Sequence, residues 1–300
     1  MPPHRYRVVD VFSEAPLKGN PLAVFPDASG MSETTMQHIA RELNLSETTF
    51  VLRPSRARCA ARVRIFTPGC ELPFAGHPTL GTAFVLLKEG MIAEGTTSFR
   101  LEETAGPISV RVETGEGERP LLWLRTPKIT EGPTYDSQVA AQVLGLDGRD
   151  LLDCAPQCVS AGTPFIFVGL RNRAAVDRAW IDLTGMKLLA GNSRKPTGLF
   201  VFTPTAEGAY SRMFAPEFGI PEDPASGGAT GPLAAYMMRY GLVSSAPGTR
   251  FISEQGTRMG RRSILHVRID GVRGAHGIDV GGYVTPIVEA AMTLPRAAAH

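Results

Sequence analysis

The chain has 300 residues, of which 43% are hydrophobic and 20% are charged, and its formal net charge at pH 7 is +2. This length exceeds what one hydrophobic core usually supports, so we expect two domains. Basic and acidic residues are interspersed without a block of Lys and Arg, which argues against nucleic acids and anionic membranes as partners.

The N-terminal segment MPPHRYRVVDVF lacks the apolar core of a signal peptide, and no uninterrupted apolar run approaches the length of a membrane span. We therefore expect a cytoplasmic protein with no membrane partner. The six histidines show no metal-binding spacing such as HExxH, and the four cysteines form no CxxC pair, so we expect free thiols and no bound metal. The cysteines are Cys59, Cys70, Cys154 and Cys158.

The first half of the chain is rich in alternating β-branched and aromatic residues, which predict strands. These strands are expected at residues 5–12, 49–54, 61–66, 97–103 and 108–114. Residues 32–44 instead place Met36, Ile39, Ala40 and Leu43 at helical spacing, with Ser32 suited to cap the N-terminus. We expect an amphipathic helix there.

The second half repeats this mixture, with a predicted helix at 137–146 and strands at 164–170, 198–204 and 263–270. Hairpin-like connections around one helix per half favour α+β domains with mixed or antiparallel sheets. The Pro- and Gly-rich segment 126–136 suggests the boundary. We therefore assign residues 1–128 and 129–290 to two domains, and 291–300 to a frayed tail.

Two stretches of the chain are near copies: RIFTPGCELPFAGHPTLGTA at 64–83 and RMFAPEFGIPEDPASGGATGPLA at 212–234. The match extends upstream, where ETTFVLRP (47–54) aligns with TGLFVFTP (197–204). Between these segments ARVRIFTP (61–68) aligns with AYSRMFAP, and after a three-residue insertion Gly76 aligns with Gly227 and Thr79 with Thr230. Matches in the same order indicate a duplication and two pseudo-symmetric domains.

Each copy ends in a turn of small residues that opens a helix. In the first, Gly76 precedes a helix with Pro78 near its start; in the second, Gly227 and Gly228 do so, with Ser226 or Thr230 available to cap. The unpaired N–H groups of a helix start bind anions, and small residues let a ligand approach the backbone. Each turn alone could be plain helix capping. The duplication favours two turns facing one another across an interdomain cleft that holds a small anionic substrate, for example a carboxylated one.

Known cofactor motifs do not occur in these turns. The chain contains neither GxxxxGK[ST] nor a strand-linked GxGxxG, and no lysine lies in the turns to form a Schiff base with pyridoxal phosphate. We therefore expect a mechanism without a cofactor.

The two copies differ in their ionisable residues. Glu47 stands before a strand where the second copy has Thr197, and the turns carry His77 in the first half but Asp223 and Gly228 in the second. A carboxylate from one side only would move a proton on one face of a substrate, whereas inversion needs two matched bases. The structural interpretations also stay open: a surface glutamate, a core or capped histidine, and a capping aspartate.

These stretches, together with residues 8–25, 40–51 and 167–170, resemble the phenazine-biosynthesis PhzF family, which shares the diaminopimelate-epimerase-like fold. The resemblance runs along nearly the whole chain. It implies two similar domains, each a barrel-like sheet around a central helix, with the active site between them. It also implies a homodimer that uses no metal or organic cofactor.

In the characterised family member the reaction is isomerisation of trans-2,3-dihydro-3-hydroxyanthranilate. The resemblance implies that Glu47 moves a proton between ring carbons, giving an enol that tautomerises to the ketone. It also implies that His77 and Asp223 help to bind and polarise the substrate, while the backbone at Gly76 and Gly227 contacts it.

One departure concerns the second turn. The family pattern E-D-x-[AT]-[TS]-G-S ends in a serine that touches the substrate, whereas EDPASGG here has Gly228 in that place. A site that loses a matched hydrogen bond discriminates differently, so we expect a changed substrate. In the epimerase relatives two cysteines act as bases, at positions near Ala75 and Ser226 here, and Cys70 lies outside the turn. An isomerase is therefore favoured over an amino-acid epimerase or racemase, and over a non-catalytic binding protein.

Overall fold

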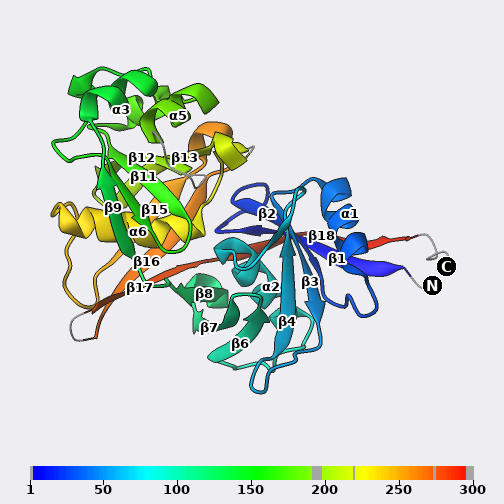
Figure 1. Cartoon of the computed structure of the whole chain (residues 1–300). Helices are drawn as coiled ribbons and strands as arrows, with labels where there is room; N and C mark the ends of the chain where they lie inside the picture. Colours follow the sequence, from blue (N-terminus) through cyan, green and yellow to red (C-terminus); the bar gives the residue numbers. More distant parts are fainter. Residues whose placement is uncertain (1–2, 191–197, 219, 273–274, 295–300) are drawn as a thin grey trace. The chain divides into compact units, whose positions relative to one another are not determined.

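Two units of similar topology make up the structure, a computed structural model that describes residues 3–190, 198–218, 220–272 and 275–294 (Figure 1). The first unit contains Met1–Leu124 and Gly282–His300, and the second contains Arg125–Gly281. The division near residue 124 lies close to the expected boundary after residue 128. The C-terminal segment differs from the expectation, because it returns to the first unit.

The first unit has a mixed sheet and two helices. Its strands are β1 (His4–Val11), β2 (Asn20–Phe25), β3 (Glu47–Leu52), β4 (Ala61–Phe66), β5 (Glu71–Leu72), β6 (Ser98–Glu103), β7 (Gly106–Thr114), β8 (Pro120–Arg125) and β18 (Val284–Met292). Its helices are α1 (Glu33–Leu43) and α2 (Gly76–Lys88). The strand order is β18-β1-β2-β3-β4-β6-β7-β8, with β5 also on β4; β2–β3 and β4–β6 are parallel and the other pairs antiparallel.

The second unit repeats this order. Its strands are β9 (Thr130–Thr134), β10 (Gln157–Ser160), β11 (Pro164–Gly169), β12 (Gly198–Thr205), β13 (Gly208–Ala215), β14 (Ile220–Asp223), β15 (Arg250–Gln255), β16 (Ser263–Val272) and β17 (Ala275–Gly282). Its helices are α3 (Ser137–Val143), α4 (Arg173–Arg178), α5 (Leu183–Ala190) and α6 (Gly227–Arg239). The order is β9-β10-β11-β12-β13-β15-β16-β17, with β14 on β13. The parallel pairs are β11–β12 and β13–β15, at the same places in the order as β2–β3 and β4–β6 in the first unit. The predicted duplication and the α+β class are confirmed.

The assignment of the last strand is the main difference from the sequence analysis. β18 pairs antiparallel with β1, from Val284 opposite Val11 to Met292 opposite His4, so it belongs to the first unit and not to the second. The expected tail at 291–300 thus begins inside β18, and residues 295–300 lie outside the described residues. Alternation along a strand identifies its two faces but not its partner strand, which is why the pairing was not predicted.

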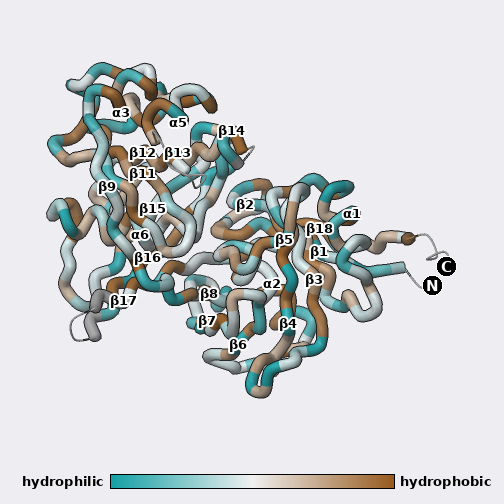
Figure 2. The backbone as a smooth tube through the Cα atoms, in the orientation of Figure 1, coloured by the Kyte–Doolittle hydropathy of each residue, from teal (hydrophilic) through white to brown (hydrophobic). Residues whose placement is uncertain are grey.

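A buried helix lies at the centre of each unit. In α2 every residue from His77 to Leu86 is buried, and at Gly81 an added Cβ would lie 2.5 Å from Leu22 Cδ2 and 2.8 Å from Val11 Cγ2. A glycine there lets the helix approach β1 and β2 closely. In the second unit, α6 packs with β11, β12 and β13 in one apolar cluster, and Figure 2 shows hydrophobic residues concentrated along β11 and β12.

The outer helix α1 confirms the helix expected at 32–44. Ser32 caps it, since its hydroxyl accepts the N–H of Thr35 at 3.1 Å, and its apolar face packs on Phe25, Phe50 and Phe66. Each unit has more than the one helix expected per half, because the first unit contains α1 as well as α2, and α3, α4 and α5 accompany α6 in the second. Within the described residues, none of the helices is long and apolar enough to cross a membrane.

Candidate functional site

The start of β3 and the start of α2 bring two of the predicted residues together. Successive residues of a strand point to opposite faces, so Glu47 shares a face with Thr49. That face is turned to α2, because Thr49 Oγ1 lies 2.8 Å from Thr82 Oγ1. His77, the second residue of α2, places Nε2 3.1 Å from Glu47 Oε2, and the two side chains are only 7% and 13% exposed.

The contact between this carboxylate and this imidazole is short but poorly aligned. Glu47 Oε2 and His77 Nε2 are both buried, and neither makes a well-directed hydrogen bond within the described part of the chain. Attraction at this distance depends on the protonation of the ring, whereas hydrogen bonding needs alignment. The two atoms are therefore adjacent without a directed hydrogen bond between them. A carboxylate and an imidazole are both side chains that serve as general acids or bases in proton transfer.

The first turn of α2 leaves its backbone donors uncapped by a side chain. The N-cap residue, Ala75, has no side chain that could accept a hydrogen bond, and Gly76 follows as the first helical residue. The unpaired N–H groups and the helix dipole both favour a negative charge here. The position beside His77 is thus suited to hold a carboxylate.

The second turn lies between β14 and α6 and is held by side chains. Asp223 ends β14 and is 8% exposed, and Ser226 Oγ donates to its Oδ2 at 2.5 Å. Gln255 accepts the N–H of Ser226 at 3.1 Å and donates to the carbonyl of Asp223 at 2.7 Å. Ser226 occupies the N-cap position, but its hydroxyl and that of Thr230 do not bond to N–H groups of the first turn, contrary to the expected capping.

The two glycines of this turn differ in surroundings. Gly227 is partly buried and Gly228 is exposed. A Cβ added at Gly228 would meet no atom within 4 Å, and this residue has an ordinary helical backbone rather than a positive φ. A serine would fit here without displacing anything in the described structure. Thr197, which aligns with Glu47, lies outside the described residues.

The structure thus places the predicted residues in two groups. Glu47, Gly76 and His77 lie together in the first unit, and Asp223 and Ser226 lie together with the glycines in the second. That both groups bind one substrate stays a prediction. Gln255, which holds the second turn, was missed by the sequence analysis. The repeat contains a signal for it, because RFISEQ at 250–255 aligns with SFRLEE at 98–103, with a phenylalanine and a glutamate in register.

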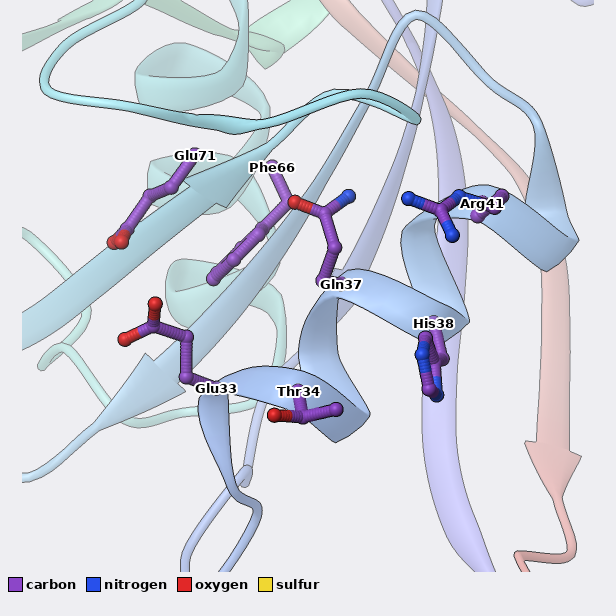
Figure 3. A pocket seen from close by; sticks show the side chains of 7 residues that line it. All are labelled: Glu33, Thr34, Gln37, His38, Arg41, Phe66 and Glu71. Carbon is purple, nitrogen blue, oxygen red and sulfur yellow. The ribbon is translucent and has the colours of Figure 1, made fainter.

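A separate pocket of about 250 Å³ lies between α1 and the β4–β5 hairpin (Figure 3). The carboxylates of Glu33 and Glu71 lie together at one end and Arg41 and His38 at the other. Both carboxylates bond to Arg64, at 2.8 and 2.6 Å. The pocket contains none of the predicted site residues, and its acidic groups are already neutralised.

Metal ligands do not gather anywhere in the described residues: they contain no cluster of three or more His, Cys, Asp or Glu side chains that could hold an ion. All four cysteines are free.

Comparisons with known proteins agree with the fold. The model of the family described as phenazine biosynthesis-like protein (PhzC-PhzF) matches residues 9–290. Trans-2,3-dihydro-3-hydroxyanthranilate isomerase of Pseudomonas chlororaphis is 36% identical over 268 residues, covering 89% of this chain and 91% of that protein. Its counterpart in Pseudomonas aeruginosa is 38% identical over 272 residues, with the same coverage of 89% and 91%.

Solved structures give the same fold. The phenazine biosynthesis protein of the PhzF family from Bacillus anthracis superimposes with a TM-score of 0.89 over 98% of this chain and 100% of that one, at 24% identity. A hydroxyproline epimerase from Agrobacterium vitis matches with a TM-score of 0.63 over 96% and 92% of the two chains, at 14% identity. The expected diaminopimelate-epimerase-like architecture is confirmed. The chain therefore belongs to the phenazine biosynthesis-like family PhzC-PhzF, an enzyme family whose named relatives here are isomerases.

Proposed function

We propose that this chain is a cofactor-independent isomerase that moves a proton within a small carboxylated substrate. The observation that carries the proposal is the 3.1 Å contact between Glu47 and His77 at the uncapped start of α2. An acid–base carboxylate, a polar partner and an anion-binding helix start are the groups that such a reaction needs.

In the proposed reaction Glu47 removes a proton from one carbon of the substrate. The electron pair of that bond forms a new double bond, the old double bond shifts, and Glu47 returns the proton to a second carbon. The resulting enol tautomerises to the ketone, so no proton or electron is lost. His77 polarises the substrate, while Asp223 and the backbone at Gly76 and Gly227 hold its polar groups.

The substrate class comes from the relatives. Two proteins at 36% and 38% identity are named as isomerases of trans-2,3-dihydro-3-hydroxyanthranilate, which carries a carboxylate and an amino group on a six-membered ring. We propose a substrate of this type, bound by a homodimeric protein in the cytoplasm. Gly228 leaves open space where the family pattern has a serine, so the native substrate is proposed to differ at the group that faces this position.

Racemisation is the weaker alternative. Inversion at one carbon needs a second base opposite the first, and neither Ala75 nor Ser226 has a thiol. Ser226 already donates its proton to Asp223, and the exposed Cys70 contacts Thr67 instead. No observation favours this alternative or a binding protein without activity.

The test is deuterium incorporation. The protein is incubated in heavy water with trans-2,3-dihydro-3-hydroxyanthranilate, and the product is analysed by NMR. Deuterium at one carbon together with a shifted double bond supports the proposal, with Glu47→Gln as the inactive control. Deuterium with inversion of one carbon and no shifted double bond would indicate an epimerase. The proposal would be contradicted if neither this compound nor analogues with other substituents next to the carboxylate exchanged any hydrogen.

A further inference from the structure

A second buried carboxyl group lies behind the start of α2 and is not used by the proposed reaction. Glu103 ends β6 and is 3% exposed. Its Oε1 lies 2.6 Å from the hydroxyl of Thr79, the fourth residue of α2. Its Oε2 is buried and has no hydrogen-bond partner among the described residues. An ionised carboxylate in this place would be almost unsolvated, which is costly.

Counting protons at Thr79 indicates which form of Glu103 the geometry accommodates. The Thr79 hydroxyl lies 2.7 Å from the carbonyl of Ala75 as well as 2.6 Å from Glu103. A hydroxyl has one hydrogen, and a carbonyl only accepts. If Glu103 were ionised, one of these two short O···O contacts would have no hydrogen. If Glu103 is protonated, it donates to Thr79 and Thr79 donates to Ala75, so both contacts are satisfied.

The second unit has a side chain that cannot ionise at the equivalent position. In the parallel pairs, Ala61 of β4 lies opposite Leu101 of β6, and the equivalent Ala209 of β13 lies opposite Ser253 of β15. Two residues further on, Glu103 therefore corresponds to Gln255. Thr230 likewise repeats Thr79, with its hydroxyl donating to the carbonyl of the N-cap residue at 3.0 Å.

Gln255 shows what this position does. Its amide donates to the carbonyl of Asp223 at 2.7 Å and to the hydroxyl of Ser226 at 3.0 Å, and it accepts the N–H of Ser226 at 3.1 Å. The side chain at the end of β15, the sixth strand in the order of the second unit, thus holds the turn that precedes α6. A neutral carboxylic acid has one donor and one acceptor, and is therefore the closest ionisable equivalent of a carboxamide.

We infer that Glu103 is a neutral carboxylic acid that donates through Thr79 to the carbonyl of Ala75, and that it is a positioning residue for His77 and the Glu47–His77 pair. His77 lies between Ala75 and Thr79 in the first turn of α2, so fixing both ends of this segment fixes the ring against Glu47. The catalytic consequence rests on the proposed isomerase function; the protonation and the chain of hydrogen bonds do not.

The charged groups around Glu103 do not oppose this state. Burial raises the pKa of Glu103 to about 8, whereas a hydrogen bond donated by Thr79 to the carboxylate lowers it. Glu102, the preceding residue, points to the other face of β6, where it accepts from Ser55 and Arg56. Arg62, next to it on β4, acts on Glu102. On β3 the ionisable group is Glu47, and on α2 the ionisable groups are His77, which faces Glu47, and Lys88, which ends the helix.

The first arm of the test needs no substrate. Glutamate carboxyl carbons are labelled with carbon-13, and the NMR signal absent from Glu103→Gln is followed from about pH 5 to about pH 10. The inference requires a midpoint well above the ordinary glutamate range; a midpoint below about pH 6 would overturn it. Nitrogen-15 shifts of the His77 ring are expected to stay unchanged in Glu103→Gln and Thr79→Ser but to move in Thr79→Val, which keeps the volume and loses the hydroxyl. An unmoved ring in Thr79→Val would refute the positioning role.

The second arm measures kcat and KM on trans-2,3-dihydro-3-hydroxyanthranilate against pH. Wild type is expected to lose kcat as Glu103 ionises, at the NMR midpoint, whereas Glu103→Gln keeps kcat within about threefold and lacks this alkaline decline. Thr79→Val is expected to lower kcat at least about tenfold with little change in KM, because misplacement of a catalytic group affects the chemical step. An alkaline decline retained in Glu103→Gln would contradict the inference. If wild type does not convert this compound, the proposed substrate is wrong, and the NMR arm alone decides on Glu103.

Discussion

Replacing Glu103 by glutamine is expected to change how the stability of the first unit depends on pH. The pKa of Glu103 is raised by burial from its ordinary value of 4.5 to about 8. A carboxyl group whose pKa is higher in the folded state contributes stability that is fully present below the unfolded pKa and is lost as pH rises. The wild-type protein is therefore expected to lose stability relative to Glu103→Gln between about pH 4.5 and about pH 8.

The size of this loss follows from the two pKa values. Each pKa unit corresponds to about 1.4 kcal/mol, so the difference between wild type and variant is expected to change by about 5 kcal/mol across the whole window. Between about pH 4.5 and pH 7, the free energy of unfolding of wild type should fall by about 3 kcal/mol relative to that of Glu103→Gln. Glutamine itself does not titrate and can replace the acid as donor and acceptor. The contributions of distant titrating groups cancel in the comparison.

The structure offers a fluorescence signal for this measurement. The chain has two tryptophans: Trp123 is buried in the first unit, and Trp180 in the second is 63% exposed. In a Trp180→Phe background, urea unfolding followed by fluorescence reports the unit that contains Glu103. Glu102→Gln is the matched control, since hydrogen bonds from Ser55 and Arg56 lower the pKa of Glu102 and its contribution is lost as pH falls. Parallel pH profiles for wild type and Glu103→Gln between about pH 5 and about pH 8 would refute the reasoning.

Three further predictions concern the candidate site and its central helix. Glu47→Gln is expected to reduce turnover at least about a hundredfold, because the general base is lost; its urea midpoint should stay near that of wild type, and near-normal turnover would show that another group moves the proton. Gly228→Ser should stabilise the protein by about 0.5–1 kcal/mol, since serine is a better helix former than glycine and the site is open. The same change should raise kcat/KM on trans-2,3-dihydro-3-hydroxyanthranilate several-fold; no gain over a fully active wild type would mean that this position does not set specificity. Gly81→Ala should destabilise by about 1–3 kcal/mol, because the new Cβ would lie 2.5 Å from Leu22 Cδ2 and 2.8 Å from Val11 Cγ2; Gly228→Ala, where alanine fits, is its control in thermal unfolding, and equal stability of the two variants would contradict the packing argument.

Local patterns in the sequence were sufficient for many elements. The predicted strand at 61–66 is β4, and the helix at 32–44 is α1 with Ser32 as its cap. Alternation and capping depend on residues close together in the chain, so they can be recognised in the sequence without the tertiary structure. The duplication could also be recognised in the sequence, because motifs that recur in the same order predict secondary-structure elements in the same order. The acid–base candidates Glu47 and His77 were found from the difference between the two copies and from the resemblance to the family.

The tertiary structure decided how distant residues meet. β18 pairs with β1, although the two strands lie near opposite ends of the sequence, and the alternation within each strand contains no information about its partner. The hydroxyl of Ser226 turns to Asp223 instead of capping α6, because the buried aspartate needs a donor. The sequence placed Glu103 at the end of a predicted strand and gave it no role, and its protonation follows from burial beside Thr79 and Ala75. Residue types and their order thus determined the fold and the candidate chemistry. Partners, burial and protonation were decided only by packing, since they depend on contacts between segments that the sequence separates.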